Sequence, residues 1–287
     1  MAVTAPVLCG AASWSNRSLV HESRWYPKRS MKAAERMAYY ASRLPLVEID
    51  ATLRFPPTPD LARQWAERTP AGFTVDVQAW SLLTGAAALP DSLWEDLREE
   101  VRPDLRDRRR LYAGHLSEAG LREAWARFEH ALRPLADAGR LGAVVLRYPH
   151  WLKPGDTGRA LLATARRRLP DYRLAVELGN ADWVEGDACE DTLAFLEAHE
   201  LAYVCLDGHD LPPVVASTAD LAVVRFLGRD PDPWESSGYR YSVEELRQWV
   251  PKLRGLAEGA DVVHVLFSNT WRDCAVGNAE ELQALLT

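Results

Sequence analysis

Eight short runs rich in β-branched and aliphatic residues constrain this fold more than any other feature of the sequence. They cover residues 7–13, 46–50, 73–79, 142–148, 172–178, 201–207, 221–227 and 261–268. Most are separated by amphipathic segments with helical spacing, which include 31–44, 58–69, 121–139, 191–200 and 242–259. Such alternation predicts a parallel sheet, and eight repeats in 287 residues favour a closed (β/α)8 TIM barrel over an open doubly wound sheet.

Two connections depart from the regular alternation. Residues 80–141, between the third and fourth strands, are much longer than usual and predict a helical insertion around residues 90–110. Residues 208–220, between the sixth and seventh strands, are too short and proline-rich for a full helix. Because no linker or low-complexity segment divides the chain, we expect a single barrel domain over residues 1–287.

The last helix carries a capping signal. Asn278 is followed three residues later by Glu281, which is a capping-box-like pattern. This predicts that the helix begins at Asn278 and that residues 269–277 form the loop after the eighth strand.

Composition narrows the class of protein. The net charge of −7 argues against a nucleic-acid partner, and we expect the arginine clusters at 106–110 and 165–169 to be solvated faces. No apolar run is long enough to span a membrane, the N-terminus lacks a signal pattern, and the four cysteines form no C-x-x-C pair. We therefore expect a cytoplasmic protein with reduced thiols. No G-x-G-x-x-G turn follows the first run, and we expect no cofactor.

Polar residues gather where the predicted strands end. Glu48 and Asp50 are two positions apart, so they point to the same face of their strand. In a TIM barrel the active site lies at the C-terminal ends of the strands, where such carboxylates face a wet mouth rather than a dry core. The other polar residues at these ends are Glu177, Asp207, Arg225 and Asn269. Their convergence predicts a ligand site.

Aromatic and basic residues add to this prediction. Seven of the eleven tryptophans follow predicted strands, namely Trp14, Trp25, Trp80, Trp151, Trp183, Trp234 and Trp271. They predict an aromatic mouth, although we expect about half of them, Trp25 first, only to pack loops onto the barrel. Around the last two strands lie Arg225, Arg229, Arg240 and Arg272, which either hold a phosphate or pair with Asp230, Asp232 or Asp273.

Six motifs in a specific order cover nearly the whole chain. They are GAASW (10–14), YYASRLPLVEIDAT (39–52), TPAGF (69–73), VELGNADW (176–183), VRFLGRD (224–230) and FSNTWRDCAVGNAEEL (267–282). In these motifs the chain resembles the YecE-like family, also known as domain of unknown function 72. The resemblance implies a barrel fold and brings no established reaction.

The chain also departs from the family's motifs. The family commonly places a lysine at Gln78, a histidine at Gly85, an arginine–histidine pair at Gly179 and Asn180, a histidine at Leu227 and an asparagine at Ser268. Positions that match the family are Trp14, Glu48, Thr52, Glu177, Trp183, Arg225, Gly228 and Asn269. The resemblance therefore implies a reaction that was lost or a pocket turned to another substrate.

From these residues we expect an enzyme, a hydrolase, lyase or isomerase, that acts on a small polar or anionic substrate by carboxylate acid/base chemistry. Glu177 and Glu48 are the predicted acid and base, with Asp50 and Asp207 behind them. Arg225 is expected to hold an anionic group, which Asn269 orients. The other predicted substrate contacts are Trp14, Thr52, Gln78, Trp80, Asn180, Trp183, Trp271 and Arg272.

The same carboxylates predict the electrostatics of the mouth. Glu48, Asp50, Glu177 and Asp207 outnumber the inward Arg225, so we expect an acidic pocket unless an arginine from the loops after the seventh and eighth strands folds in. Repulsion among the carboxylates, together with desolvation, predicts a raised pKa for Glu177 as the general acid.

Two other hypotheses stay open. Glu48, Glu177, Asp207 and His209 offer ligands for a divalent metal, which favours a metal-dependent hydrolase or isomerase, although their spacing matches no metal motif. Loss of the family's lysine and histidines beside a retained aromatic rim favours a barrel that only binds a ligand or a partner protein.

Overall fold

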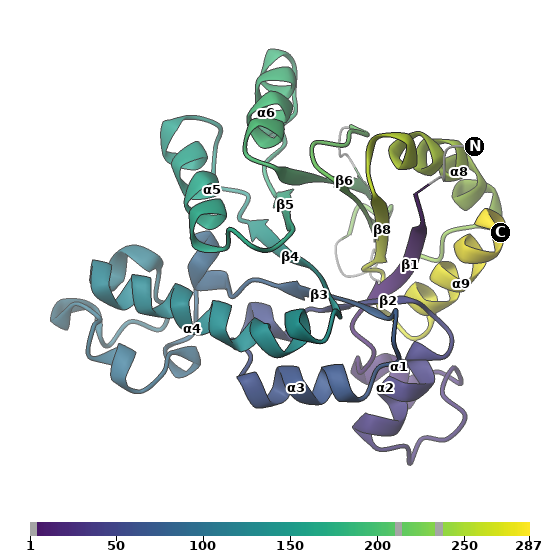
Figure 1. Ribbon diagram of the computed structural model, residues 1–287, viewed down its shortest axis with the longest axis horizontal. Coiled ribbons are helices and arrows are strands. Elements are labelled where there is room, and N and C mark those ends of the chain that lie inside the picture. The colour runs from purple at the N-terminus through teal and green to yellow at the C-terminus, as the bar shows by residue number, and fades with distance from the viewer. Residues whose placement is uncertain (1–4, 210–213, 233–237) are drawn as a thin grey trace.

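The strands form a closed parallel barrel in the sequential order β1 to β8. It is seen in a computed structural model that describes residues 5–209, 214–232 and 238–287 (Figure 1). The strands are β1 Val7–Ala12, β2 Leu46–Ile49, β3 Thr74–Gln78, β4 Leu141–Tyr148, β5 Leu174–Leu178, β6 Leu201–Gly208, β7 Leu221–Gly228 and β8 Val262–Phe267. Every predicted run forms one of these strands, so the predicted (β/α)8 TIM barrel is confirmed.

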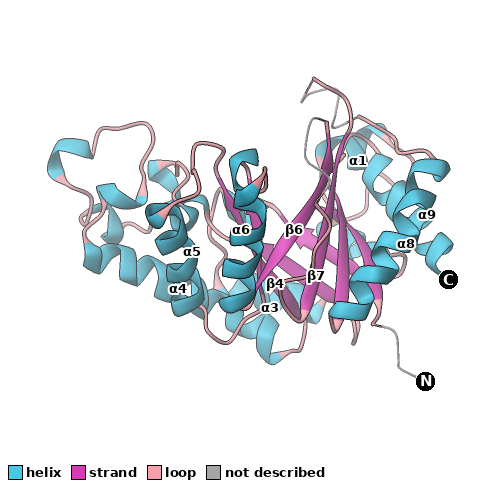
Figure 2. Cartoon of the chain, turned by 90° about the horizontal axis from the view of Figure 1, so that it is seen from above, coloured by secondary structure: helices cyan, strands magenta, loops and turns pink. Residues whose placement is uncertain are grey.

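Helices surround the barrel on its outer face (Figure 2). They are α1 Arg17–Glu22, α2 Ala33–Ala41, α3 Pro59–Glu67, α4 Glu118–Asp137, α5 Asp156–Arg168, α6 Asp187–Ala198, α8 Val243–Gly259 and α9 Cys274–Leu286. Local signals set several of their starts. Thr58 caps α3 and precedes a proline at the first helical position, and Ser242 and Glu245 form a capping box at α8. Within the described residues, no helix has the length and apolar character that crossing a membrane requires.

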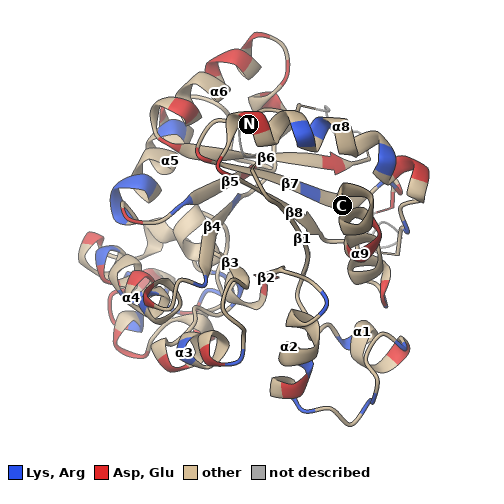
Figure 3. Cartoon of the chain, turned by 45° about the vertical axis from the view of Figure 1, so that its right-hand side comes forward, with Lys and Arg blue, Asp and Glu red and all other residues tan. Residues whose placement is uncertain are grey.

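The two faces of each strand lead to different environments. Inward-facing side chains form an apolar cluster inside the barrel, made of Leu46, Ala143, Val145, Ala175, Ala202, Val204, Leu221, Val223, Val262 and Leu266. Outward-facing side chains such as Tyr203 and Cys205 belong to the larger core beneath the helices. The parity of a strand residue therefore decides whether it reaches the mouth or the helical layer. Figure 3 shows that most charged residues lie on the helices and loops.

The predicted insertion between β3 and β4 is present. It consists of short 3-10 turns, Ser81–Thr84, Pro90–Ser92, Asp96–Arg98, Pro103–Leu105 and Ala113–His115, followed by α4. Prolines begin two of these turns and prevent one long helix from forming there. Two antiparallel bridges, Ala88 to Leu111 and Val101 to Leu116, tie the insertion together. In the connection from β6 to β7, residues 214–220 contain no helix, and residues 210–213 lie outside the described part of the chain.

The predicted start of the last helix is wrong. Helix α9 begins at Cys274, so Asn278 lies inside it rather than at its cap. The buried Asn278 side chain instead makes tertiary hydrogen bonds: its Nδ2 donates to Tyr241 O at 2.8 Å, and its Oδ1 accepts from Tyr241 N at 3.1 Å. The capping pattern is local, whereas these partners come from a segment distant in sequence, and the tertiary contacts prevail.

Candidate functional site

Four charged side chains from four strands meet inside the C-terminal part of the barrel. Arg225 of β7 is only 1% exposed and lies between two carboxylates. Its Nη1 donates to Glu48 Oε1 at 2.9 Å, its Nη2 donates to Glu48 Oε2, and its Nε lies 2.6 Å from Glu177 Oε2. Glu177 also accepts from Arg147 Nε at 2.7 Å. We call these four residues the buried charge network.

Two uncharged side chains complete this network. Gln78 Nε2 donates to Glu48 Oε1 at 2.7 Å, and Arg225 Nη1 donates to Ser268 Oγ at 2.8 Å. A buried charge is tolerated when it is paired and hydrogen-bonded, and Arg225 is held on both edges of its guanidinium plane. Within the network, Glu48 and Arg225 are sealed from solvent, whereas the Arg147 side chain is 42% exposed. Arg147 is therefore the member through which the network reaches the surface.

Strand register explains why Arg147 and Glu177 are neighbours. The two residues are paired across the parallel strands β4 and β5, and they share the inward parity of Val145 and Ala175. Arg147 uses only Nε to reach Glu177. Among the described residues, its two terminal nitrogens have no hydrogen-bond partner and remain available to a ligand.

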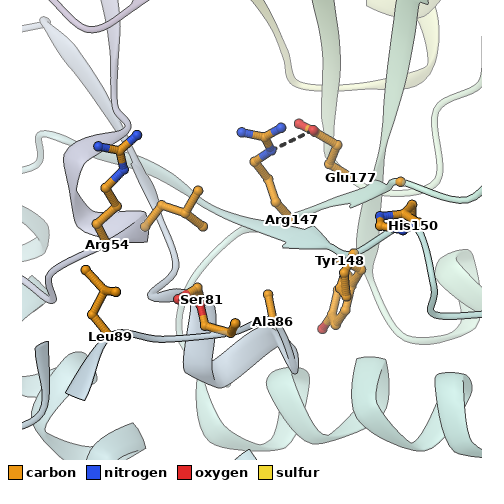
Figure 4. A pocket seen from close by; sticks show the side chains of 12 residues that line it. Arg54, Ser81, Ala86, Leu89, Arg147, Tyr148, His150 and Glu177 are labelled. Atoms are coloured by element: carbon orange, nitrogen blue, oxygen red, sulfur yellow. Dashed lines mark hydrogen bonds and ion pairs between the residues drawn. The ribbon is translucent and has the colours of Figure 1, made fainter. Parts of the chain in front are cut away.

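A cavity of about 470 Å³ opens beside this end of the network. Its walls come from the loops after β2, β3 and β4 and from the end of β5. They comprise Leu53, Arg54, Ser81, Ala86, Ala87, Leu89, Arg147, Tyr148, Pro149, His150, Glu177 and Gly179. Figure 4 shows the guanidinium groups of Arg54 and Arg147 on the same side of the cavity, with Ser81, Ala86 and Leu89 on the opposite side.

The expected acidic pocket and the raised pKa of Glu177 are both contradicted. Burial raises the pKa of Glu177, but the charges of Arg225 and Arg147 and their hydrogen bonds outweigh burial and hold this pKa below its ordinary value. The cavity wall carries Arg54 and Arg147 against the single acid Glu177. The excess arginines come from β4 and the loop after β2, rather than from the loops after β7 and β8.

The like-charge argument applies instead to Asp50. Desolvation, followed by repulsion from Glu48, raises the pKa of Asp50 above its ordinary value. Asp50 directly follows β2 and has no arginine bonded to its carboxylate among the described residues. The carboxylate with the raised pKa is thus a neighbour of the network rather than a member of it.

Asp207 does not reach the mouth. It shares the outward parity of Tyr203 and Cys205, and its carboxylate accepts hydrogen bonds from Arg229 Nε at 2.8 Å and from Trp249 Nε1 at 2.8 Å. Arg229 Nη2 donates a further bond at 2.7 Å, and Tyr241 Oη donates another at 2.9 Å. Burial raises its pKa, but these hydrogen bonds and the charge of Arg229 hold the pKa below its ordinary value. Asp207 joins β6 to α8 outside the barrel.

Asn269 and Thr52 also make structural contacts. Asn269 is buried, and its Nδ2 donates to Tyr239 O at 2.7 Å and to Asn278 Oδ1 at 3.0 Å. The Thr52 hydroxyl donates to Ile49 O at 2.8 Å or Gln78 O at 2.7 Å. Neither residue lines the cavity.

The tryptophans do not form the predicted aromatic wall, because none of the described ones lines the cavity. Trp80 is buried against Trp94, and buried Trp183 donates from Nε1 to Leu152 O at 2.8 Å. Trp14 is half-buried, Trp271 and Arg272 are exposed beside a different hollow near α1, and Trp234 lies outside the described residues. Asn180 accepts from Asp182 N and thereby caps a short turn after β5.

The residues proposed for a metal are not brought together. Arg225 separates and neutralises Glu48 and Glu177, and Asp207 lies on the other side of the strand layer. Across the described ranges, no three His, Cys, Asp or Glu side chains are grouped so that they could hold a metal ion. This donor set therefore forms no site.

Of the predicted residues, Glu177 lines the cavity. Glu48, Gln78 and Arg225 do not line it, but they belong to the hydrogen-bonded and ion-paired network that contains Glu177. Sequence reasoning missed Arg54, Arg147, Tyr148, His150 and the apolar part of the wall. A signal existed for Arg147, because strand alternation gives it the same parity as Ala143 and Val145 at the end of an apolar run.

Glycines occupy two positions where the family resemblance implies larger side chains, and the backbone at each position favours glycine. A Cβ at Gly179 would lie 2.7 Å from Tyr148 O, so β4 and β5 approach too closely there for any larger residue. Gly85 has a φ of 77°, in the left-handed region that favours glycine. Gly179 contributes backbone to the cavity wall, whereas Gly85 does not line the cavity.

A closed barrel whose charged network and cavity lie at the C-terminal ends of its strands defines a TIM-barrel protein with its candidate site in the usual place for this fold. More particularly, the chain belongs to the family described as "Protein of unknown function DUF72", whose model matches residues 8–287.

Similar proteins agree with this assignment. The UPF0759 protein YunF of Bacillus subtilis is 24% identical over 98% of this chain and 94% of its own length. A solved DUF72 family protein from Enterococcus faecalis has a TM-score of 0.76 at 21% identity, covering 98% of both chains. Another, from Thermotoga maritima, has a TM-score of 0.74 at 22% identity over 98% of this chain and 99% of its own. These likenesses support the fold.

Proposed function

We propose that this chain is an enzyme that binds a small anionic substrate in the cavity at the mouth of the barrel. The observation that carries the proposal is the geometry of Arg147, which uses Nε to hold Glu177 and leaves two nitrogens for a ligand. Arg54 adds a second guanidinium group on the same side of the cavity. A guanidinium group can donate two parallel hydrogen bonds to a pair of oxygens of a carboxylate or a phosphate.

In this proposal Glu177 accepts a proton rather than donating one, because its lowered pKa keeps it ionised near neutral pH. Asp50, whose pKa is raised, does not line the cavity, so its proposed role as proton donor requires a substrate that reaches beyond the cavity wall. Arg225 positions Glu177 without touching the substrate. This arrangement suits a hydrolase, lyase or isomerase, and the cytoplasmic location remains a prediction from the sequence.

Anion binding can be tested with inorganic phosphate by isothermal titration calorimetry. We expect saturable binding with one site per chain. Binding should be at least tenfold weaker in Arg147→Gln, which is on the order of the free energy of one charge-assisted hydrogen bond. Arg122→Gln is the matched control, because Arg122 is an exposed residue on α4 that pairs with Glu118 at 3.8 Å. Equal affinity in both variants would remove Arg147 from the site.

Catalysis needs a separate test, because the arginines that neutralise Glu48 and Glu177 also favour a barrel that binds without turnover. A screen of phosphate esters and of hydroxy and keto acids should find a substrate whose turnover Glu177→Gln abolishes while the fold is retained. Binding of a screened compound with no product would support the binding protein instead. Full turnover in Glu177→Gln would refute the role of Glu177.

A further inference from the structure

Apolar residues form part of the cavity wall, and Figure 4 shows two of them, Ala86 and Leu89, on the side opposite the arginines. Leu53, Ala86, Ala87, Leu89 and Pro149 contribute to the wall. The segment that carries three of these residues is held in place by Ala88, whose backbone N and O bond to Leu111 at 2.8 and 2.9 Å. Ala88 faces the core and is buried, whereas the next residue, Leu89, is 48% exposed. An extended backbone turns successive side chains to opposite faces, so this bridge presents Leu89 to the cavity.

Some of the large exposed apolar side chains lie on the loops that form this cavity. The six on the described surface are Phe55, Leu61, Leu89, Trp151, Val243 and Trp271. Three of them follow β2, β3 and β4, whose loops form the cavity: Leu89 is in the wall, and Phe55 and Trp151 directly follow the wall residues Arg54 and His150. Apolar surface concentrated at one place marks a binding region more often than the same residues scattered singly.

Charge and apolar surface are therefore separated across one cavity, as Figure 4 shows for the arginine and Leu89 sides. An ion as small as acetate or phosphate would satisfy the arginines and leave most of about 470 Å³ to water beside an apolar wall. A ligand that also fills the apolar side gains the free energy of removing that surface from water.

We propose that the ligand of this site is amphipathic: an aryl or alkyl carboxylate or phosphate monoester, with its anionic group on Arg147 and Arg54 and its apolar body against Ala86 and Leu89. This inference rests on the proposed function and specifies its substrate class. Both head groups offer a pair of anionic oxygens to a guanidinium group. The experiment below determines which of the two head groups binds.

The test compares two pairs of probes that differ only in the apolar body: inorganic phosphate with phenyl phosphate, and acetate with benzoate. Calorimetry should show phenyl phosphate or benzoate binding about tenfold or more tightly than its small partner, as burial of a ring predicts. The pair that binds more tightly overall identifies the head group. Leu89→Ser should reduce the ratio of affinities within that pair to about threefold or less, by the same burial argument.

Leu61→Ser is the control, because Leu61 is an exposed leucine of α3 that does not line the cavity; it should keep the full ratio. Arg147-dependent binding with no preference for the ring would overturn this inference and leave the proposed function standing. A preference for the ring that survives Leu89→Ser would overturn the assignment of the apolar wall. Failure of all four probes to bind would overturn both proposals.

Discussion

Replacement of Arg225 by methionine should be strongly destabilising, because it removes the cation at the centre of the buried charge network. Methionine fills a similar volume, so the main loss is electrostatic. Without Arg225, Glu177 keeps Arg147, but the fully buried Glu48 keeps only the amide of Gln78. Breaking a buried ion pair and leaving one charge unpaired costs about 3–5 kcal/mol, and we expect a loss in this range.

The measurement is the free energy of unfolding in urea, with unfolding monitored by circular dichroism at neutral and at acid pH. Arg127→Met is the matched control, because Arg127 of α4 bonds to Asp96 and Glu123 at a partly exposed position; we expect it to cost about 1 kcal/mol or less. The double variant Arg225→Met/Glu48→Gln should recover more than half of the loss, since it no longer buries an unpaired carboxylate.

The pH dependence provides a second check. In the native protein the pKa of Glu177 is lowered, so its contribution to stability is present above the unfolded pKa and is lost as the pH falls through the folded pKa. In Arg225→Met, protonation of the unpaired Glu48 carboxylate at low pH removes the cost of burying its charge. The difference in unfolding free energy between the native protein and the variant should therefore decrease from neutral pH toward about pH 4, which is near the pKa of Glu in an unfolded chain. A gap that is below about 1 kcal/mol, or that does not change with pH, would refute this account of the network.

Three further predictions concern neighbouring residues. Tyr148→Phe should leave stability unchanged or raise it by up to about 1 kcal/mol in urea unfolding, because the buried Tyr148 hydroxyl has no partner among the described residues; a clear loss would reveal a hidden partner. Asp50→Asn should raise the melting temperature at neutral pH, since a raised folded pKa means that stability is lost as the pH rises through that pKa, and the gain should vanish below the unfolded pKa. Asn278→Ala should lower the free energy of unfolding by about 2–4 kcal/mol, because it leaves the backbone N–H and C=O of Tyr241 without hydrogen-bond partners. A loss near zero would contradict the tertiary role of Asn278.

Much of the fold follows from local sequence. The alternation of apolar runs with amphipathic segments located all the strands, and the unusual length of residues 80–141 indicated the insertion. These features depend on side chains a few positions apart, so the sequence carries them directly. The same local reasoning failed at Asn278, where a capping pattern competed with hydrogen bonds to a distant segment.

The candidate site was predicted only in part, for two physical reasons. First, alternation says that Asp207 lies in phase with Cys205, but not which face of the strand points inward; closure of the barrel decided that Asp207 packs beneath α8.

Second, the state of a carboxylate depends on partners far away in the chain. Arg225 and Glu48 are 177 positions apart, and Arg147 reaches Glu177 only through the register of β4 and β5. The sequence determined which strand ends carry charge. Tertiary structure decided which charges neutralise one another, because Coulomb energy depends on distance and burial, and both are set when the barrel closes.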